Sequence, residues 1–394
     1  MENNRKLLKG IKIGKIPDEQ FQEYRLQQIF DGYKWDYQSG SHQSTISDEV
    51  ILLDEANRNF LMEATEALAK ETVELELALR EQPHLLRKLG LSERIIEVIS
   101  TCTYDPKEHV RYMRFDFHPT TKGWRISEVN SDVPAGLQES SLHPAFAQKY
   151  FPDYKPMGNF ANSLHEAVKE HLSVGDTIAY VYDSHTVEDM QLLRFLGDYF
   201  EEQGFPQFHG NPEQVEWLDN EAIGIKAIIR HYPAETLEYS AENILEKFFN
   251  TSAVGINHPI AVIAQSKRLP LVWDEVGVDV STWKKMLPET LPLDVTSSPA
   301  LGKWIFKPAF GRVGEGVGIP GSVSRHEIRE IEKTAKANAD QWIMQKMFKS
   351  YPIDGLHFSV GAFVVDGKFA SCFSRASNFP LMNFTAKELP VLWK

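Results

Sequence analysis

The sequence has few cysteines, no excess of positive charge and no long apolar run, and each shortage excludes a class of protein. Cys102 and Cys372 are its only cysteines, too few for a disulfide scaffold and without metal-ligand spacing, so we expect a reducing, cytoplasmic setting. The 42 Lys and Arg residues against 55 Asp and Glu residues give a formal net charge of −13, which disfavours nucleic acid as a partner. No segment offers the roughly 18 uncharged apolar residues of a membrane span, so we expect no membrane partner.

The length predicts more than one lobe, and the first is expected to be helical. A chain of 394 residues exceeds the roughly 100–200 residues of a typical domain, so we expect two or three lobes. Between Asp18 and about Arg87 apolar residues recur at intervals of three and four, Ile51 and Leu52 among them. This spacing is typical of helices that bury one face.

A second region, from about residue 155 to residue 295, has the order of a small α/β domain. A β-rich run at Thr177–Asp183 precedes a helical pattern at Val187–Phe200, and another apolar strand is predicted at Ile223–Ile229. Strands that alternate with helices favour a parallel sheet.

Two runs of alternating polarity are predicted to form a β-hairpin near residue 120. Val110–Phe117 and Trp124–Asn130 alternate with a period of two around the turn-like Pro119–Gly123, so each run presents its polar members on one face. Those members are Arg114, Asp116, Glu128 and Asn130. Carboxylate and amide oxygens suit Mg²⁺, which also keeps water and phosphate ligands. The face is therefore either a metal site or the solvated side of an exposed hairpin.

A glycine-rich segment, Lys307–Val317, follows the predicted strand Trp304–Lys307. Its glycines, Gly311 and Gly314 among them, let the backbone approach a bulky anion, and Lys307 adds a charge at the strand end. A mobile lid over ATP is one interpretation, and an ordinary turn is the other. The segment has neither the P-loop nor the dinucleotide-binding pattern, which disfavours both of those classes.

Three further charged residues are candidates for a site. Arg375 follows a predicted terminal hairpin made of Phe358–Val365 and Lys368–Phe373, and its guanidinium could steady a transferring phosphoryl group. Glu188 and Asp189 begin the predicted helix after residue 186. They could receive a cationic amine, or they could be surface acids favoured there by the helix dipole.

Together these segments resemble the synthetase domain of the glutathionylspermidine synthase family, a branch of the ATP-grasp ligases. The motifs that carry the resemblance, in the order of the family, are Arg114-Phe115-Asp116-Phe117, Glu128-Val129-Asn130-Ser131-Asp132, Asn257-His258-Pro259, Trp273-Asp274-Glu275, and Lys307-Pro308 through Gly311-Arg312-Val313-Gly314. The resemblance extends from about Phe21 to Phe384. The hairpin motifs combined with the glycine-rich motif are far more specific than either alone.

The resemblance implies an α+β ATP-grasp fold assembled from both chain ends, with an inserted α/β pre-ATP-grasp domain. Residues 1–150 would hold the N-terminal helical part and the metal-binding hairpin. Residues 151–296 would form the inserted domain, and residues 297–394 the glycine-loop lid and the C-terminal lobe. ATP and Mg²⁺ are the implied cofactors, with two metal ions expected and the nucleotide held between sheets.

Positions within the family motifs also imply roles for individual residues. The implied Mg²⁺ ligands are Asp116, Glu128 and Asn130. The implied ATP contacts are Arg114, Lys307, Gly311, Gly314, Gln345, Lys346 and Met347. The arginines expected near the transferred phosphoryl group are Arg114 and Arg375. The places at which the family contacts its substrate hold Glu188, Asp189, Arg230 and His231.

The implied reaction joins a small-molecule or peptide carboxylate to an amine, a polyamine among the candidates, and releases ADP and phosphate. Two departures from the family pattern bear on it. Where the family carries small hydroxyl residues that help to hold glutathione, this chain has Val133-Pro134-Ala135-Gly136, which disfavours glutathione as the acid. The segment Gln345–Phe348 resembles the one that carries the family's adenine contacts and is called here the adenine segment. A second ATP lysine, expected shortly before it, is replaced by Gln341, and Lys346 is a candidate substitute.

Three hypotheses follow for the function. The first is an active ATP-dependent carboxylate–amine ligase that forms an amide through an acyl-phosphate, and the complete hairpin and lysine set motivates it. The second is a catalytically silent ATP-binding protein of the same fold with a regulatory or assembly role, motivated by Gln341. A purely structural role would require the ordered motifs to be incidental.

Overall fold

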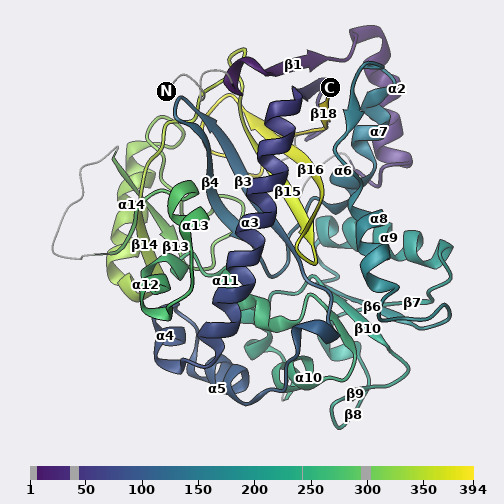
Figure 1. Cartoon of the computed structure of the whole chain (residues 1–394), viewed down its shortest axis with the longest axis vertical. Coiled ribbons are helices and arrows are strands. Elements are labelled where there is room, and N and C mark those ends of the chain that lie inside the picture. Colours follow the sequence, from purple (N-terminus) through teal and green to yellow (C-terminus); the bar gives the residue numbers. More distant parts are fainter. Residues whose placement is uncertain (1–6, 36–43, 242, 294–302) are drawn as a thin grey trace.

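The computed structural model describes residues 7–35, 44–241, 243–293 and 303–394. Its largest sheet joins strands from both halves of the chain (Figure 1). Neighbouring strands are antiparallel, and their order is β17 (Lys387–Leu389), β16 (Lys368–Ser377), β15 (His357–Val365), β3 (Tyr112–Thr120) and β4 (Gly123–Asn130). Both predicted hairpins are therefore confirmed, and they share one sheet. An α+β fold assembled from both chain ends is confirmed as well.

The two faces of this sheet bury separate cores. Helix α3 (Glu55–Arg80) crosses one face, in front of β3 and β15 in Figure 1. Its first turn is capped by Asp54, whose side chain accepts a hydrogen bond of 2.9 Å from the Asn57 backbone N–H, which satisfies one of the free donors at a helix start. Ala362 and Val364 of β15 belong to the hydrophobic core that the sheet shares with α3. Phe363 alternates to the other face, where its ring packs on Phe160 of α8 (Phe160–Val168).

The middle of the chain forms the predicted parallel sheet. Its strands, in spatial order, are β11 (Val254–Ile256), β10 (Ala227–Arg230), β6 (Ile178–Val181) and β7 (Gln207–Gly210), and all neighbours are parallel. Helix α9 (Val187–Glu202) connects β6 to β7 and confirms the predicted helix. The prediction of a strand from Ile223 is wrong at its start. Gly224 adopts a φ of +72° there, which places it in a turn, and the strand begins at Ala227.

The predicted helical opening is confirmed in α2 (Asp18–Phe30), α3 and α4 (Pro83–Lys88). It is wrong for Ile51 and Leu52, which lie in β2 (Glu49–Leu53). Ile51 pairs with Ile13 of β1 (Ile11–Lys15) and with Val391 of β18 (Val391–Trp393). Both faces of this strand are buried, with Ile51 and Leu53 in one core and Val50 and Leu52 in another. Its apolar residues are therefore consecutive and mimic part of a helical pattern.

The remaining elements are a three-stranded sheet, short strands, further helices and short 3₁₀ helices. A three-stranded sheet has the order β12 (Thr290–Pro292), β14 (Trp342–Lys346) and β13 (Trp304–Pro308), with α14 (Arg325–Ala337) beside it. Short strands are β5 (Lys155–Pro156), β8 (Trp217–Leu218) and β9 (Glu221–Ala222). Further helices are α5 (Glu93–Thr101), α6 (Leu137–Ser141), α7 (His143–Gln148), α10 (Ile244–Asn250), α11 (Val262–Gln265), α12 (Trp273–Val276) and α13 (Ser281–Met286). Short 3₁₀ helices are η1 (Pro106–Glu108), η2 (Pro212–Gln214), η3 (Ala234–Tyr239), η4 (Pro259–Ala261), η5 (Leu269–Leu271) and η6 (Ala339–Gln341).

The division into residues 1–150, 151–296 and 297–394 stays a prediction, and its second boundary lies outside the described residues. Helices α11, α12 and α13 pack against α3, so the end of the middle segment contacts the first. None of the helices in the described ranges is long and apolar enough to cross a membrane.

Candidate active site

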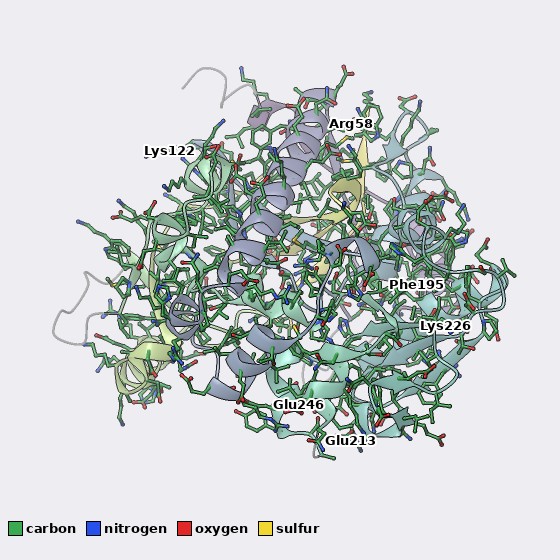
Figure 2. All side chains as sticks on the ribbon, turned by 60° about the horizontal axis from the view of Figure 1, so that its bottom comes forward. Arg58, Lys122, Phe195, Glu213, Lys226 and Glu246 are labelled. Atoms are coloured by element: carbon green, nitrogen blue, oxygen red, sulfur yellow. The ribbon has the colours of Figure 1, made fainter. Side chains whose placement is uncertain are left out.

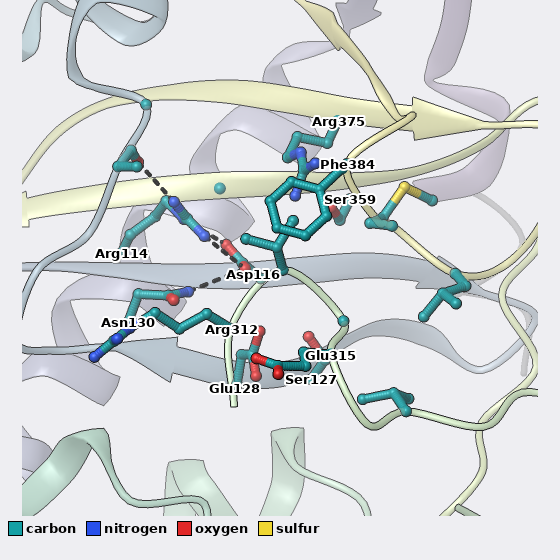
Figure 3. A pocket seen from close by; sticks show the side chains of 18 of the residues that line it. Arg114, Asp116, Ser127, Glu128, Asn130, Arg312, Glu315, Ser359, Arg375 and Phe384 are labelled. Carbon is teal, nitrogen blue, oxygen red and sulfur yellow. Dashed lines mark hydrogen bonds and ion pairs between the residues drawn. The ribbon is translucent and has the colours of Figure 1, made fainter. Parts of the chain in front are cut away.

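The hairpin β3–β4 brings three of its predicted site residues into contact. Arg114 donates to Asp116 from Nε (2.7 Å) and Nη2 (3.0 Å), and Asn130 donates from Nδ2 to the same carboxylate (3.1 Å) (Figure 3). The register shifts between Phe115 and Phe117, so one residue of β3 lies opposite two of β4. A bulge of this kind redirects side chains next to a site. Glu128 shares the face of Asn130 by ordinary alternation, and the bulge brings Ser127 to the cavity wall beside it.

These residues line a cavity of about 1110 Å³. Its wall also includes the glycine-rich segment after β13, the start of α9, residues 347–350 after β14 and the loop before β17. The predicted site residues on this wall are Arg114, Asp116, Glu128, Asn130, Glu188, Asp189, His231, Lys307, Gly311, Gly314, Met347 and Arg375. Segments that are far apart in the sequence therefore meet at one cavity.

Two lysines reach the hairpin from other parts of the chain. Lys307, at the end of β13, donates from Nζ to the backbone carbonyl of Ser127 (3.1 Å). Lys267, just after α11, lies with Nζ 3.2 Å from the Glu128 carboxylate and donates to the carbonyl of Gly311 at 2.6 Å. Both lysines line the cavity. They place two positive charges between the carboxylates of the hairpin and the glycine-rich segment.

These neighbours shift the pKa values of the buried groups. Burial alone would raise the pKa of Glu128, but the attraction of Lys267 and Lys307 outweighs it and holds that pKa at about 2. Burial lowers the pKa of Lys307 to about 8, although Glu128 opposes the shift. Glu128 is therefore an anion at neutral pH, as a metal ligand must be.

The start of α9 forms another part of the wall. Burial raises the pKa of Asp189 to about 7, and the neighbouring Glu188 adds to the shift. The Asp189 carboxylate oxygen lies 3.4 Å from Nε2 of His231. Burial lowers the pKa of His231 to about 3, so its imidazole is neutral near pH 7. A carboxyl that titrates near neutrality beside a neutral imidazole can exchange a proton with an amine.

Arg375 belongs to β16. Its side chain lies beside Phe384 and above the β3–β4 hairpin in Figure 3. It donates from Nη2 to the carbonyl of Asn383 (2.6 Å), and burial lowers its pKa. Arg114 lies over the ring of Phe373, 5.5 Å from its centre. The two arginines thus frame the space above Asp116.

The structure places three predicted site residues outside this cavity. The Gln345 side chain is buried and donates to Thr290 (3.1 Å), and Lys346 pairs with Glu289 (3.1 Å). Arg230 is buried in an ion pair with Asp132 and donates to it from Nη1 (3.2 Å). None of the three lines the cavity wall.

Gln341, which occupies the place expected for a second ATP lysine, is also absent from this wall. Its side chain approaches Gly90 instead, where an added Cβ would meet Oε1 at 2.9 Å. The sequence did not single out Lys267. No local pattern marks it, because its partners Glu128 and Gly311 are distant in the chain.

The donor set suits Mg²⁺ together with a nucleotide. Within the described ranges, no three His, Cys, Asp or Glu side chains group as metal ligands. The donors of this hairpin are two carboxylates, Asp116 and Glu128, and one amide, Asn130. Mg²⁺ commonly takes one or two carboxylates and fills its octahedron with water and phosphate oxygens. A bound metal would displace the hydrogen bonds of Arg114 and Asn130 on Asp116 and of Lys267 on Glu128.

Comparisons with known proteins place the fold. A glutathione synthetase-like effector from Globodera pallida, solved in its apo form, has a TM-score of 0.64 at 10% identity and covers 96% of this chain and 99% of its own. A putative gamma-glutamylcysteine synthetase from Methylobacillus flagellatus has a TM-score of 0.48 at 12% identity, with coverages of 78% and 86%. Curated protein sequences give no match. The first similarity supports the α+β fold, and the second is too low to carry an argument.

A comparison with protein families gives the assignment. The family model described as glutathionylspermidine synthase preATP-grasp matches residues 17–393. The match includes the hairpin, the parallel sheet, the glycine-rich segment and the C-terminal strands. The chain therefore belongs to the glutathionylspermidine synthase family.

Proposed function

We propose that the protein is an ATP- and Mg²⁺-dependent ligase that joins a carboxylate to an amine through an acyl-phosphate. One observation carries the proposal. The ammonium of Lys307 lies 3.1 Å from the Ser127 carbonyl, on the same strand as Glu128 and Asn130 and at the same cavity as Asp116. The groups proposed to bind phosphate and metal, from distant segments, thus face one space that is large enough for a nucleotide.

The nucleotide phosphates would lie between the hairpin and the glycine-rich segment. Lys307, Lys267 and Arg114 would bind their negative charge, and Gly311 and Gly314 would let the backbone approach. Of the proposed adenine segment, Met347 lines the cavity, whereas the side chains of Gln345 and Lys346 do not. Mg²⁺ on Asp116, Glu128 and Asn130 would offset phosphate charge when bound.

The chemistry divides into two transfers. An oxygen of the substrate carboxylate attacks the γ-phosphorus of ATP, the bond to the bridging oxygen breaks, and ADP leaves. Arg114 and Arg375 would stabilise the charge on the phosphoryl oxygens. The amine nitrogen then attacks the acyl carbon, and phosphate leaves with the former carboxylate oxygen. The glycine-rich segment would exclude water from the acyl-phosphate.

The start of α9 is the proposed amine side of the cavity. Glu188 and Asp189 would attract a cationic amine, which must lose a proton before it attacks. Asp189, with a pKa of about 7, is the proposed proton acceptor. It contacts His231, whose pKa of about 3 keeps the imidazole neutral. The substrate role predicted for Arg230 is not part of this proposal, because the buried ion pair with Asp132 occupies its guanidinium.

Hydroxylamine gives a test that does not require the natural amine, since it captures an acyl-phosphate as a hydroxamate. The protein, ATP, Mg²⁺ and a panel of carboxylic acids should release ADP and form a hydroxamate with at least one acid. The variant Glu128→Gln should lose this turnover, because a neutral amide replaces the proposed metal ligand. Hydroxamate formation that is unchanged in Glu128→Gln would contradict the proposal.

The alternative of a silent ATP-binding protein rested on Gln341. Gln341 lies away from the cavity, and Lys267 supplies a second cation on its wall. This arrangement removes the reason for expecting impaired ATP chemistry. Binding of a non-hydrolysable ATP analogue without turnover on any acid would favour the alternative.

A further inference from the structure

An ion pair joins the glycine-rich segment to the chain that follows β10, and the chemistry proposed above does not use it. Arg312, which lines the cavity (Figure 3), donates from Nη2 to Glu235 in η3. The two residues are 77 positions apart in the sequence. Just before η3, His231 and Pro233 line the same cavity. The ion pair therefore bridges the glycine-rich segment and the proposed amine side.

The surroundings of Glu235 favour this contact. Its side chain is 15% exposed, and burial raises the pKa of its carboxyl. The charge of Arg312 opposes this rise, whereas the charge of Asp132 adds to it. Arg230 also acts on Glu235, but its guanidinium is paired with Asp132. A largely buried carboxylate is destabilised when its counterion leaves, so the ion pair holds Arg312 in place.

Two further contacts fix the same segment on other sides of the cavity. The carbonyl of Gly311 accepts a hydrogen bond of 2.6 Å from Nζ of Lys267. Gly314 lies against the loop before β17, where an added Cβ would be 2.9 Å from the carbonyl oxygen of Met382. Arg312 lies between these two points in the sequence. The segment is therefore held beside the hairpin, at the loop before β17 and, through Arg312, at the amine side.

The ion pair lies close to the proposed proton acceptor. Besides burial, which is the largest cause of their pKa shifts, Asp189 and His231 both experience the charge of Arg312. Water that reached the acyl-phosphate here would attack the acyl carbon in place of the amine nitrogen. Phosphate would leave and the carboxylic acid would be regenerated, so ATP would be hydrolysed without an amide. A segment fixed at this side excludes that water.

We propose that Arg312 and Glu235 form a latch, which holds the glycine-rich segment closed over the amine side of the cavity and so directs the acyl-phosphate to the amine rather than to water. This inference rests on the proposed ligase function. Both are positioning residues, because their ion pair acts on the segment and not on the reacting atoms. Separation of the pair frees the segment to move, which admits substrates and releases products.

The ratio of ADP released to hydroxamate formed tests the latch. It is measured with an acid that reacts in the unchanged protein and with hydroxylamine near its KM, so that water can compete. Arg312→Met and Glu235→Gln should each raise the ratio about threefold or more, because the acyl-phosphate is lost to water when the segment is no longer held. The double variant should resemble the single variants, since each removes the same contact.

Glu235→Gln distinguishes a latch from a direct contact of Arg312 with phosphate. This variant keeps the guanidinium, so its affinity for a non-hydrolysable ATP analogue should stay within about twofold of the unchanged protein while the ratio rises. If the ratio rises only in Arg312→Met, and ATP affinity falls with it, Arg312 acts on phosphate and the latch is wrong.

Hydrogen exchange of the backbone amides in residues 311–318 does not depend on turnover. Both latch variants should exchange about fivefold faster there, because opening no longer breaks the ion pair. Glu246→Gln is the control, since Glu246 lies on the outer surface, where it pairs with Arg94 (Figure 2). An unchanged ratio in a working ligase would overturn the inference and leave the proposed function intact. No turnover with any acid, in a protein that still binds an ATP analogue, would overturn the proposed function and with it the role of the latch.

Discussion

Lys267 and Gly311 are 44 residues apart in the sequence, yet Nζ of Lys267 donates a hydrogen bond of 2.6 Å to the carbonyl of Gly311. The same ammonium lies 3.2 Å from the carboxylate of Glu128. The backbone N–H of Lys267 also donates to the carbonyl of Ala309 (2.9 Å). One residue thereby ties the glycine-rich segment to the proposed metal ligand, so nucleotide binding and metal binding should depend on it together.

Replacing Lys267 with methionine should change the affinities for ATP and for Mn²⁺ in opposite directions. ATP binding should weaken by about 10- to 100-fold, because one charge-assisted hydrogen bond to phosphate is lost. Mn²⁺ alone should bind more tightly, because the ammonium no longer competes for Glu128. Calorimetry with a non-hydrolysable ATP analogue and Mn²⁺ titration by electron paramagnetic resonance measure the two affinities.

Lys346→Met is the matched control for this change. Lys346 pairs with Glu289, its side chain is 59% exposed, and it does not line the cavity. Both affinities should stay close to those of the unchanged protein. If Lys267→Met leaves ATP affinity intact while Lys346→Met reduces it, the second phosphate cation is Lys346 and the assignment of Lys267 is wrong.

The sequence predicted those parts of the fold and site whose pattern is local. Period-two alternation indicates that Arg114 and Asp116 share one face of a strand. The position of Lys307 at a strand end indicates that its charge lies beside the glycine-rich segment. The bulge opposite Asp116 was not predictable, because alternation alone does not reveal an extra residue in a strand. It brings Ser127, which was not predicted, to the cavity wall beside Glu128.

Contacts between segments that are distant in the sequence could not be predicted either, because no local pattern indicates them. Lys34, Glu139 and Glu388 come from three distant elements, and none follows a pattern that indicates its partners. Arg230 occupies a position at which the family contacts its substrate, but its guanidinium is paired with Asp132. Family position indicates where a residue lies along the chain, whereas a buried counterion decides what it is free to bind.

The ion pair of Arg230 with Asp132 should be structural. Both side chains are at most 1% exposed, and Asp132 also accepts from the backbone N–H of Ala234 (2.8 Å). Arg230→Met should lower the free energy of unfolding by about 3–5 kcal/mol, because it leaves a buried carboxylate without its counterion. Urea denaturation measures this loss.

The surface pair of Arg94 with Glu246 provides the comparison. Its side chains are 39% and 37% exposed, so Arg94→Met should cost about 1 kcal/mol or less. The Arg230 variant, where folded, should bind an ATP analogue with unchanged affinity. A stable Arg230→Met protein with a raised substrate KM would instead restore the substrate role predicted from the sequence.

Gly314 should be required for its conformation as well as its size. Its φ is +72°, and a Cβ there would lie 2.9 Å from the carbonyl oxygen of Met382. Gly314→Ala should displace the glycine-rich segment and weaken binding of an ATP analogue roughly fivefold or more, for a strain of about 1–2 kcal/mol. Gly321→Ala is the control, because its φ is also positive (+90°) but a Cβ there meets nothing within 4 Å. Equal losses of affinity in both variants would show that backbone strain alone is responsible.

Asp189 should make stability depend on pH. Its pKa of about 7 in the folded protein lies above the ordinary 3.8, so the folded state keeps a proton that the unfolded chain has lost. Ionising the buried carboxyl costs stability, and this cost grows between about pH 4 and pH 7. Relative to the unchanged protein, Asp189→Asn should therefore gain about 2 kcal/mol across this range, with allowance for a side chain that is 24% exposed.

Glu188→Gln separates the two causes of this raised pKa. Burial is the larger cause and repulsion from Glu188 is the next, so removing the neighbouring charge should shift the pH range of the Asp189 effect downward without abolishing it. Denaturation of the single and double variants from pH 4 to pH 8 measures the shift. If Asp189→Asn and the unchanged protein have parallel stability curves throughout, the fold does not raise the pKa of Asp189, and its carboxylate is too weak a base to take the proton of an amine.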